Sequence, residues 1–308
     1  MVSKTIEKVA PAQTEKWNTR NLGLRVAADG ASALSAGLLV APVITMIDKA
    51  IIVRAATSTP LTHTLASSLR MLLFRPHAFL LSTPFFLVSS LYTGTYLTAN
   101  LIDTLSSTLS SATASTTTSG PAKFLATSAA NLSLCLYKDS QFTRMFGAGS
   151  TSPTSTPPPP ASHTPAPRRA IPRTSYALFA LRDSLTIFAS FNLPPLLAPH
   201  FSSSPLLASL NLSPETAAQF LAPASMQLLS TPLHLLGLDL YNRPRGQYMH
   251  WTGRALVGYG PSPWERARKV ARDWVGSSVA RMGRIVPAFG VGGVVNGGLR
   301  GRLMRGLE

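Results

Sequence analysis

The stretch that decides the fold is GASALSAGLLVAPVITMIDK, residues Gly30–Lys49. No residue from Gly30 to Ile47 is charged, and an acid and a base follow directly. An apolar helix of about 17 to 25 residues crosses the roughly 30 Å hydrocarbon core of a bilayer. The stretch therefore predicts a membrane-spanning helix that ends in a charged step.

Further runs of the same kind follow along the chain. Pro76–Ile102 and Thr216–Leu238 are also uncharged. Three weaker runs are Phe124–Tyr137, Ser175–Pro199 (interrupted by Arg182 and Asp183) and Val275–Leu299 (interrupted by Arg281 and Arg284). Charged residues make up only 13% of the 308 residues, where an average soluble domain has about 25%. We predict an all-α bundle of six transmembrane helices. The alternative, a soluble helical bundle, requires charged outer helix faces, which these runs lack.

The domain organisation follows from the same runs. We expect a single membrane domain over residues 26–299, between an N-terminal polar segment (1–25) and a basic tail (300–308). Residues 104–120 form a Ser/Thr-rich connector. The loop 147–172 contains four consecutive prolines, Pro157–Pro160, and is predicted to be disordered because proline supplies no backbone donor. The lone Cys135 is predicted to be a small buried hydrophobe.

The charged step recurs about every hundred residues. An acid followed by a base closes the odd-numbered runs at Asp48-Lys49, at Asp139 with Arg144, and at Asp239 with Arg243. This period predicts three helix pairs, over residues 26–103, 121–200 and 216–299. Loops after the odd runs are basic and loops after the even runs are nearly free of Lys and Arg, so the positive-inside rule places the first set on the matrix or cytoplasmic side.

These features resemble a known superfamily. Three helix pairs with an acid-base step closing each odd helix are similar to the mitochondrial carrier superfamily, although the expected prolines are displaced. Four segments also look like a fungal family of uncharacterised mitochondrial membrane proteins: PVITMID (Pro42–Asp48), LYTGTY (Leu91–Tyr96), TPLHLLGLDLYNR (Thr231–Arg243) and RIVPAFG (Arg284–Gly290). The resemblance implies a carrier-like fold in the mitochondrial inner membrane and supplies no substrate.

The charged steps suggest a gate. Charges near a membrane persist if they pair or line water, and three pairs around a pseudo-threefold axis can close a transport path. The pairs would be Asp48 with Lys49, Asp139 with Arg144, and Asp239 with Arg243. Alternatively, these residues only end helices at the interface, where a base neutralises the helix dipole.

A second group of charges lies deeper in the runs. Arg182, Asp183, Arg281 and Arg284 are candidates for a water-filled cavity, because ionisable groups inside a membrane are functional by default. Several guanidiniums facing one cavity favour an anionic solute, since Arg binds carboxylate and phosphate in bidentate fashion. Tyr96 and Asn100 can add hydrogen bonds. Alternatively, these arginines lie at the interface or extend toward it.

Other chemistries find no support in the sequence. The histidines form no metal-like pair, no catalytic motif is present, and we expect neither a cofactor nor an enzyme. His234 is expected to be a packing residue, and Gly293 with Gly297 a close helix contact. The net charge is +16. The basic residues behind it are predicted to lie in loops and tails, which argues against nucleic acid as a partner. The basic segment Arg254–Arg272 suggests contact with an anionic lipid such as cardiolipin.

We therefore expect a multi-pass protein of the mitochondrial inner membrane, carrier-like, that transports a small anionic solute. The alternative is a transport-inactive carrier relative that acts as a membrane scaffold or assembly partner.

Overall fold

The computed structural model of the protein describes residues 17–110, 113, 120–148, 170–202, 205, 209, 213–244, 247–249, 255–257 and 260–307. Helices dominate these ranges, as predicted. The described strands are β1 (Gln247–Met249) and β2 (Ala255–Val257), which pair antiparallel as a small hairpin. The centre of the predicted disordered loop lies outside the described residues, as does Arg254.

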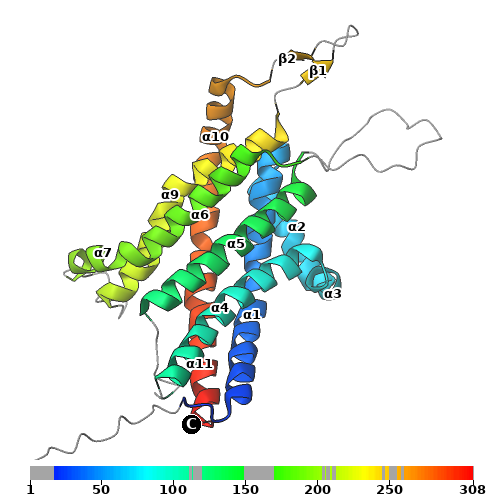
Figure 1. The fold of residues 1–308 in the computed structure, drawn as a ribbon. Helices are drawn as coiled ribbons and strands as arrows, with labels where there is room; N and C mark the ends of the chain where they lie inside the picture. The colour runs from blue at the N-terminus through cyan, green and yellow to red at the C-terminus, as the bar shows by residue number, and fades with distance from the viewer. Residues whose placement is uncertain are drawn as a thin grey trace, which may run out of the picture.

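The helices follow one another along the chain (Figure 1). Their bounds are α1 (Leu22–Thr57), α2 (Leu61–Phe74), α3 (Pro76–Leu80), α4 (Thr83–Leu109), α5 (Gly120–Phe146), α6 (Arg173–Asn192), α7 (Pro194–Phe201), α9 (Pro214–Asn242), α10 (Pro263–Gly283), η1 (Val286–Val291) and α11 (Gly292–Arg305). The last three elements run in line, with η1 as a π-helical segment between two α-helices.

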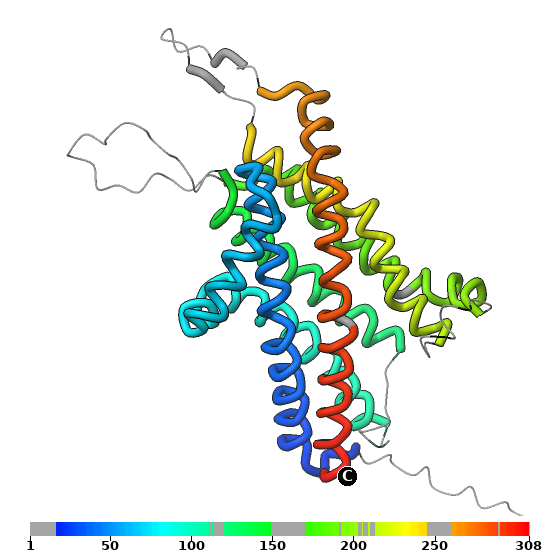
Figure 2. Tube along the Cα trace, turned by 180° about the vertical axis from the view of Figure 1, so that it is seen from behind, coloured from blue at the N-terminus to red at the C-terminus, as the bar shows by residue number. Residues whose placement is uncertain are grey.

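The long helices form a closed ring. In the described chain, α1, α4, α5, α6, α9 and the α10–α11 segment each pack against the next, and α11 returns to α1. We call this arrangement the six-helix ring. Figure 2 shows α1 and the α10–α11 segment side by side along their length. Toward one end of the molecule, α6, α7 and α9 lean away from α1 and α11 (Figure 1).

Helix starts follow local chemistry. The Ser82, Ser213 and Ser262 side chains each accept a hydrogen bond from the backbone N–H three residues on, and a proline lies in the first turn of the helix that follows. This combination satisfies an unpaired donor and presets the helical φ. At α10 the cap is reciprocal, because the Ser262 amide donates to the Glu265 carboxylate at 2.7 Å. That hydrogen bond lowers the pKa of Glu265.

Three predicted boundaries differ from the structure. The run Pro76–Ile102 is not one helix, because the chain turns at Leu81 and the Ser82 cap starts α4. The run Ser175–Pro199 divides at Leu193, where Pro194 starts α7. The predicted connector from Thr104 is helical up to Leu109. Its Thr104, Ser107 and Thr108 side chains are buried; Thr104 Oγ1 donates to Asp29, and Thr108 Oγ1 donates to the Thr104 carbonyl.

The C-terminal boundary also lies further along than predicted. Helix α11 continues through Arg305, and both Arg300 and Met304 are buried. Residues 300–305 therefore belong to the folded body. The predicted close contact at Gly293 and Gly297 is wrong, because neither has a neighbouring atom within 4 Å of an added Cβ. The close approach occurs at Gly292, which faces the Tyr96 hydroxyl, and at Gly37, which faces the Thr93 backbone.

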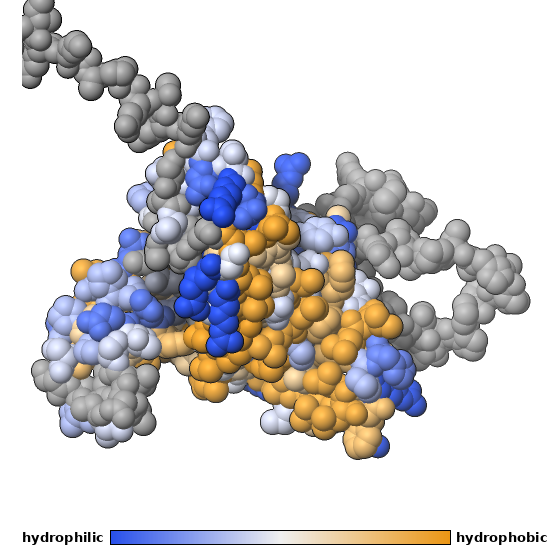
Figure 3. Space-filling model, turned by 90° about the horizontal axis from the view of Figure 1, so that it is seen from below, coloured by the Kyte–Doolittle hydropathy of each residue, from blue (hydrophilic) through white to orange (hydrophobic). Residues whose placement is uncertain are grey.

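The distribution of polarity is reversed from that of a soluble protein. Among the described residues, more polar and charged side chains are buried than hydrophobic ones, while Leu73, Phe74, Leu81 and Phe86 are each at least two-thirds exposed. Figure 3 shows hydrophobic residues over much of the face seen from below. Soluble proteins bury their large hydrophobes and expose their charges. An apolar exterior around a polar interior is what a lipid environment favours.

Hydropathy alone identifies fewer spans than the fold has long helices. In the described part of the chain, only α1 is both long and apolar enough to cross a membrane by composition, with a mean hydropathy of 2.0 over its best window. Buried Ser, Thr and ionisable residues lower the mean of the others. The predicted helical fold is thus confirmed for the described residues, whereas five of the six predicted membrane spans lack this hydropathy support.

Candidate functional site

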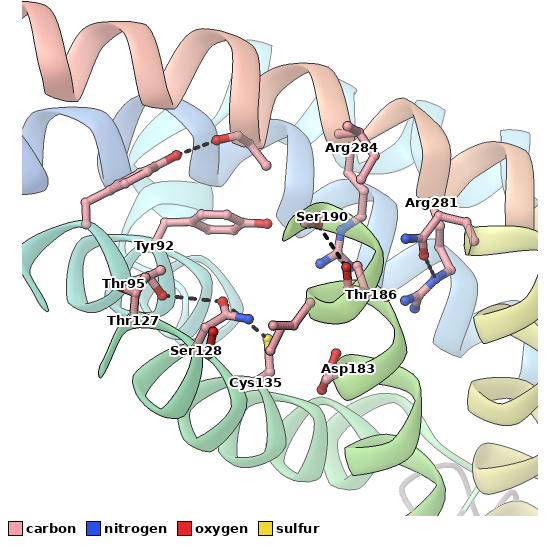
Figure 4. Close-up of a pocket in the computed structure, with 16 residues that line it drawn as sticks. Tyr92, Thr95, Thr127, Ser128, Cys135, Asp183, Thr186, Ser190, Arg281 and Arg284 are labelled. Atoms are coloured by element: carbon pink, nitrogen blue, oxygen red, sulfur yellow. Dashed lines mark hydrogen bonds between the residues drawn. The ribbon is translucent and has the colours of Figure 1, made fainter. Parts of the chain in front are cut away.

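A cavity of about 140 Å³ lies inside the six-helix ring. Its walls come from α4, α5, α6, α9 and the junction between α10 and η1 (Figure 4). The volume is close to the roughly 150 Å³ of an engineered protein cavity that binds benzene. The cavity can therefore hold a small organic molecule.

Hydroxyl and amide groups line one side of this cavity. Thr127, Ser128 and Asn131 lie on α5, and Thr186 and Ser190 lie on α6. The Thr127 and Ser128 hydroxyls are buried and have no hydrogen-bond partner among the described residues. Buried polar groups without partners are uncommon in folded proteins. This wall thus offers donors and acceptors to a bound molecule.

Two charged groups on the cavity wall have unused binding capacity. Arg281 of α10 is 3% exposed, and its Nε donates to Gln227 Oε1 at 2.9 Å, but no ion pair within the described chain joins it to an acid. Asp183 of α6 uses Oδ1 to pair with Arg182 Nη2 at 2.6 Å, and its buried Oδ2 has no described partner. Figure 4 shows both side chains at the same end of the cavity.

An ion network lies directly against that end. Asp48 Oδ2 accepts from Lys138 Nζ at 2.5 Å, Lys138 Nζ also lies 2.7 Å from Asp139 Oδ1, and Asp139 Oδ2 accepts from Arg182 Nη2 at 2.5 Å. Arg284 Nη1 donates to Asp48 Oδ1 at 2.6 Å. We call these residues, with Asp183, the ion network. It joins α1, α5, α6 and the end of α10 in a single cross-connection.

The ion network and the cavity share residues. Asp183 and Arg284 line the cavity and are also members of the ion network. Ile51, Ile52 and His234 pack beside the network. A molecule in the cavity therefore touches the groups that hold the four helices together.

A separate polar cluster holds α1, α4 and α11 together toward the chain termini. Asp29 Oδ1 accepts from Arg300 Nε at 2.7 Å, and Asp29 Oδ2 accepts from Thr104 Oγ1 at 2.5 Å. Asn100 and Asn296 exchange two side-chain hydrogen bonds of 2.9 Å. Because every partner lies on one of these three helices, the cluster makes them a single unit.

The protein-family comparison matches almost the whole chain. A family model described as "Probable citrulline exporter" matches residues 32–304, which include part or all of every long helix. The chain belongs to this family. A search of curated proteins found no significant match. Membership of an exporter family supports membrane residence and solute transport, and it carries no evidence for the carrier superfamily, for the fungal family or for mitochondria.

The predicted solute-binding residues lie in three different places. Tyr96, Arg281 and Arg284 do line the cavity. Arg182 lies in the ion network, where its Nη2 pairs with both Asp139 and Asp183, while its buried Nε has no described partner. Asn100 is buried in the other polar cluster, bonded to Asn296 and to Ser32, and does not line the cavity.

The predicted gate pairs are only partly the ones that form. Asp239 pairs with Arg243 at 2.5 Å and also with Arg266. Lys49 does not pair with Asp48, whose two carboxylate oxygens are bound by Lys138 and Arg284. The Lys49 Nζ lies 5.5 Å from the centre of the Phe146 ring instead. Asp139 pairs with Lys138 and Arg182, and Arg144 is left with a buried Nε that has no described partner.

Several site residues were missed in the sequence. Lys138 directly precedes Asp139 and bridges two acids, but its partner Asp48 is 90 residues away. Gln227 orients Arg281 from within an uncharged run, and no spacing or motif along that run marks its amide. His234 packs with its ring 5.1 Å from that of Phe179, as predicted, but its buried Nδ1 has no described hydrogen-bond partner. Cys135 is buried as predicted.

Proposed function

We propose that this protein exports a small zwitterionic amino acid with a neutral, hydrogen-bonding side chain, such as citrulline, through the cavity of the six-helix ring. One observation carries the proposal. The cavity presents a guanidinium without an acidic partner, a carboxylate oxygen without a donor, and a wall of hydroxyl and amide groups between helices. The family description points to the same substrate.

Each part of such a substrate has a matching group. The α-carboxylate would be bound by the Nη groups of Arg281, because planar guanidinium matches carboxylate in bidentate geometry. The α-ammonium would donate to Asp183 Oδ2. A ureido or amide side chain would bond to Thr127, Ser128 and Asn131, which together offer donors and acceptors. All three interactions gain strength where water is excluded.

The paired state of the arginines argues for a zwitterion over the anion expected from the sequence. Arg182 and Arg284 are each held by an aspartate of the ion network. Arg281 is the remaining guanidinium of the three, and it faces the cavity together with Asp183. A substrate with one charge of each sign therefore satisfies both groups.

The shared residues provide a route from binding to opening. A substrate carboxylate at Arg281 also competes with Asp48 for Arg284, and its ammonium competes with Arg182 for Asp183. Both competitions weaken the ion network that joins α1, α5, α6 and α10. We propose that this network is the closed gate of an alternating-access, carrier-like cycle. The mitochondrial inner membrane remains part of the proposal on the sequence resemblance alone, as do lipid contacts of the basic segment.

Transport assays test the proposal directly. The full-length protein is reconstituted in liposomes, and counterflow of labelled citrulline is compared with that of glutamate, lysine and alanine. We expect citrulline to exchange fastest, and Arg281→Gln to abolish exchange. Arg302→Gln, an exposed arginine of α11, is the control and should keep wild-type exchange. Absence of citrulline counterflow by the wild-type protein would contradict the proposed function and would reopen the scaffold alternative.

A further inference from the structure

The charges of the cavity wall and the ion network do not balance. The cations are Lys138, Arg182, Arg281 and Arg284, and the acids are Asp48, Asp139 and Asp183. Four positive groups against three negative ones leave one positive charge in excess. His234, which lies beside the network, can only add to this excess if it takes up a proton.

The other acids of the described chain are engaged elsewhere or exposed. Asp29 pairs with Arg300, Asp103 with Lys123, Asp239 with Arg243 and Arg266, and Asp273 with Arg54 and Lys269. Glu215 and Glu265 lie on exposed first turns of α9 and α10. None of these acids reaches the cavity. The excess charge must therefore be balanced by something other than a described side chain.

The excess can be assigned to one residue. Lys138, Arg182 and Arg284 each lie within 2.7 Å of at least one acid of the network. Arg281 has Gln227 as its described side-chain partner, and a neutral amide oxygen carries no charge to offset it. A buried cation without a counter-charge is strongly unfavourable in a medium of low polarity. A bound zwitterion leaves the net sum unchanged, but its carboxylate gives Arg281 a directly contacting counter-charge. Without substrate, Arg281 has none among the described residues.

We infer that Arg281 binds a small inorganic monovalent anion, such as chloride, whenever the substrate carboxylate is not bound there. Gln227 Oε1 holds the guanidinium by its Nε, which leaves the two Nη groups for the anion. Ile187, Ile285 and Ala288 make part of the wall of the same cavity apolar, which reduces the competition from water. This inference rests on the proposed function only in naming the substrate carboxylate as the competitor.

Anion binding can be measured without any transport. Thermal unfolding of the purified full-length protein in detergent is followed while sodium chloride replaces sodium gluconate at constant ionic strength, since gluconate is much larger than chloride. Binding to the folded state raises the melting temperature with the logarithm of ligand concentration. We expect a saturable increase for the wild-type protein, its retention in Arg281→Lys and in the control Arg302→Gln, and its loss in Arg281→Gln.

Competition gives a second test that needs only the wild-type protein. Citrulline affinity is measured in gluconate and in chloride. The apparent Kd for citrulline should rise roughly tenfold when chloride stands at about ten times its own Kd. Three results would each overturn the inference. They are a wild-type protein that chloride does not stabilise specifically, equal stabilisation of Arg281→Gln, and a citrulline Kd that does not change with chloride. A protein that binds chloride but not citrulline would instead contradict the proposed function alone.

Discussion

Arg284 Nη1 lies 2.6 Å from Asp48 Oδ1, so a side chain that lines the cavity also joins the end of α10 to α1. The two residues are 236 positions apart in the sequence. Their ion pair therefore closes the six-helix ring and at the same time lies within reach of a bound solute. In the proposed transport cycle, this guanidinium couples substrate binding to helix separation.

The first prediction concerns the acid of this pair. Asp48→Asn removes the carboxylate that Lys138 and Arg284 share, and it leaves two buried cations with one fewer counter-charge. Breaking a buried ion pair from one side typically costs about 3 to 5 kcal/mol of stability. Thermal unfolding in detergent should show a clearly lower melting temperature. Glu215→Gln, at an exposed helix start, is the control and should cost less than about 1 kcal/mol; equal effects of the two changes would contradict the role of Asp48.

The second prediction separates substrate binding from the ion network. Asp183→Asn keeps an oxygen that can accept from Arg182 but removes the charge offered to a substrate ammonium. A hydrogen bond to a charged group is worth about 1.5 to 3 kcal/mol, so citrulline affinity should fall by roughly ten- to a hundredfold. The control Asp103→Asn changes an acid that pairs with Lys123 outside the cavity. If Asp183→Asn binds citrulline as tightly as this control does, Asp183 is not the ammonium site.

The third prediction tests the contact between α1 and α4. A Cβ at Gly37 would lie 2.8 Å from the Thr93 backbone nitrogen, whereas a Cβ at Gly30, on the same helix, meets no atom within 4 Å. Gly37→Ala should therefore force α1 and α4 apart and destabilise the protein by about 1 to 3 kcal/mol. Gly30→Ala should be neutral or should stabilise the helix by up to about 1 kcal/mol. Thermal unfolding of the two variants side by side measures the difference, and the same sign of change in both would contradict the close contact.

Most of the long helices could be predicted from the sequence because each contains a run with few charges. The first half of α10 is the exception, since six of its residues from Glu265 to Asp273 are charged. The acids at the ends of the odd runs were also found, since they recur with a regular spacing. Their partners could not be found in the same way. A sequence pattern offers the nearest base, Lys49 for Asp48, but the ion pairs cross between helices to Lys138 and Arg284. Likewise, the role of Gln227 depends on a single contact with Arg281 from another helix, which no spacing along the chain reveals.

The fourth prediction follows from the C-terminal boundary, where sequence and structure differ most sharply. Charge composition suggested a tail beginning at residue 300, yet Arg300 Nε donates to Asp29 Oδ1 at 2.7 Å and Met304 is fully buried. Truncation after Leu299 should therefore leave Asp29 buried without its base, and the removal of Met304 should expose the residues that it covers. We expect a loss of at least about 3 kcal/mol of stability. Truncation after Arg305 removes only the last three residues and should leave the melting temperature within a few degrees of the wild type.

Arg300→Gln in the full-length chain isolates the ion pair from the loss of Met304, and it should account for most of the effect of the longer truncation. If both truncations unfold at the same temperature as the wild type, the cluster of Asp29, Thr104 and Arg300 does not hold α1, α4 and α11 together.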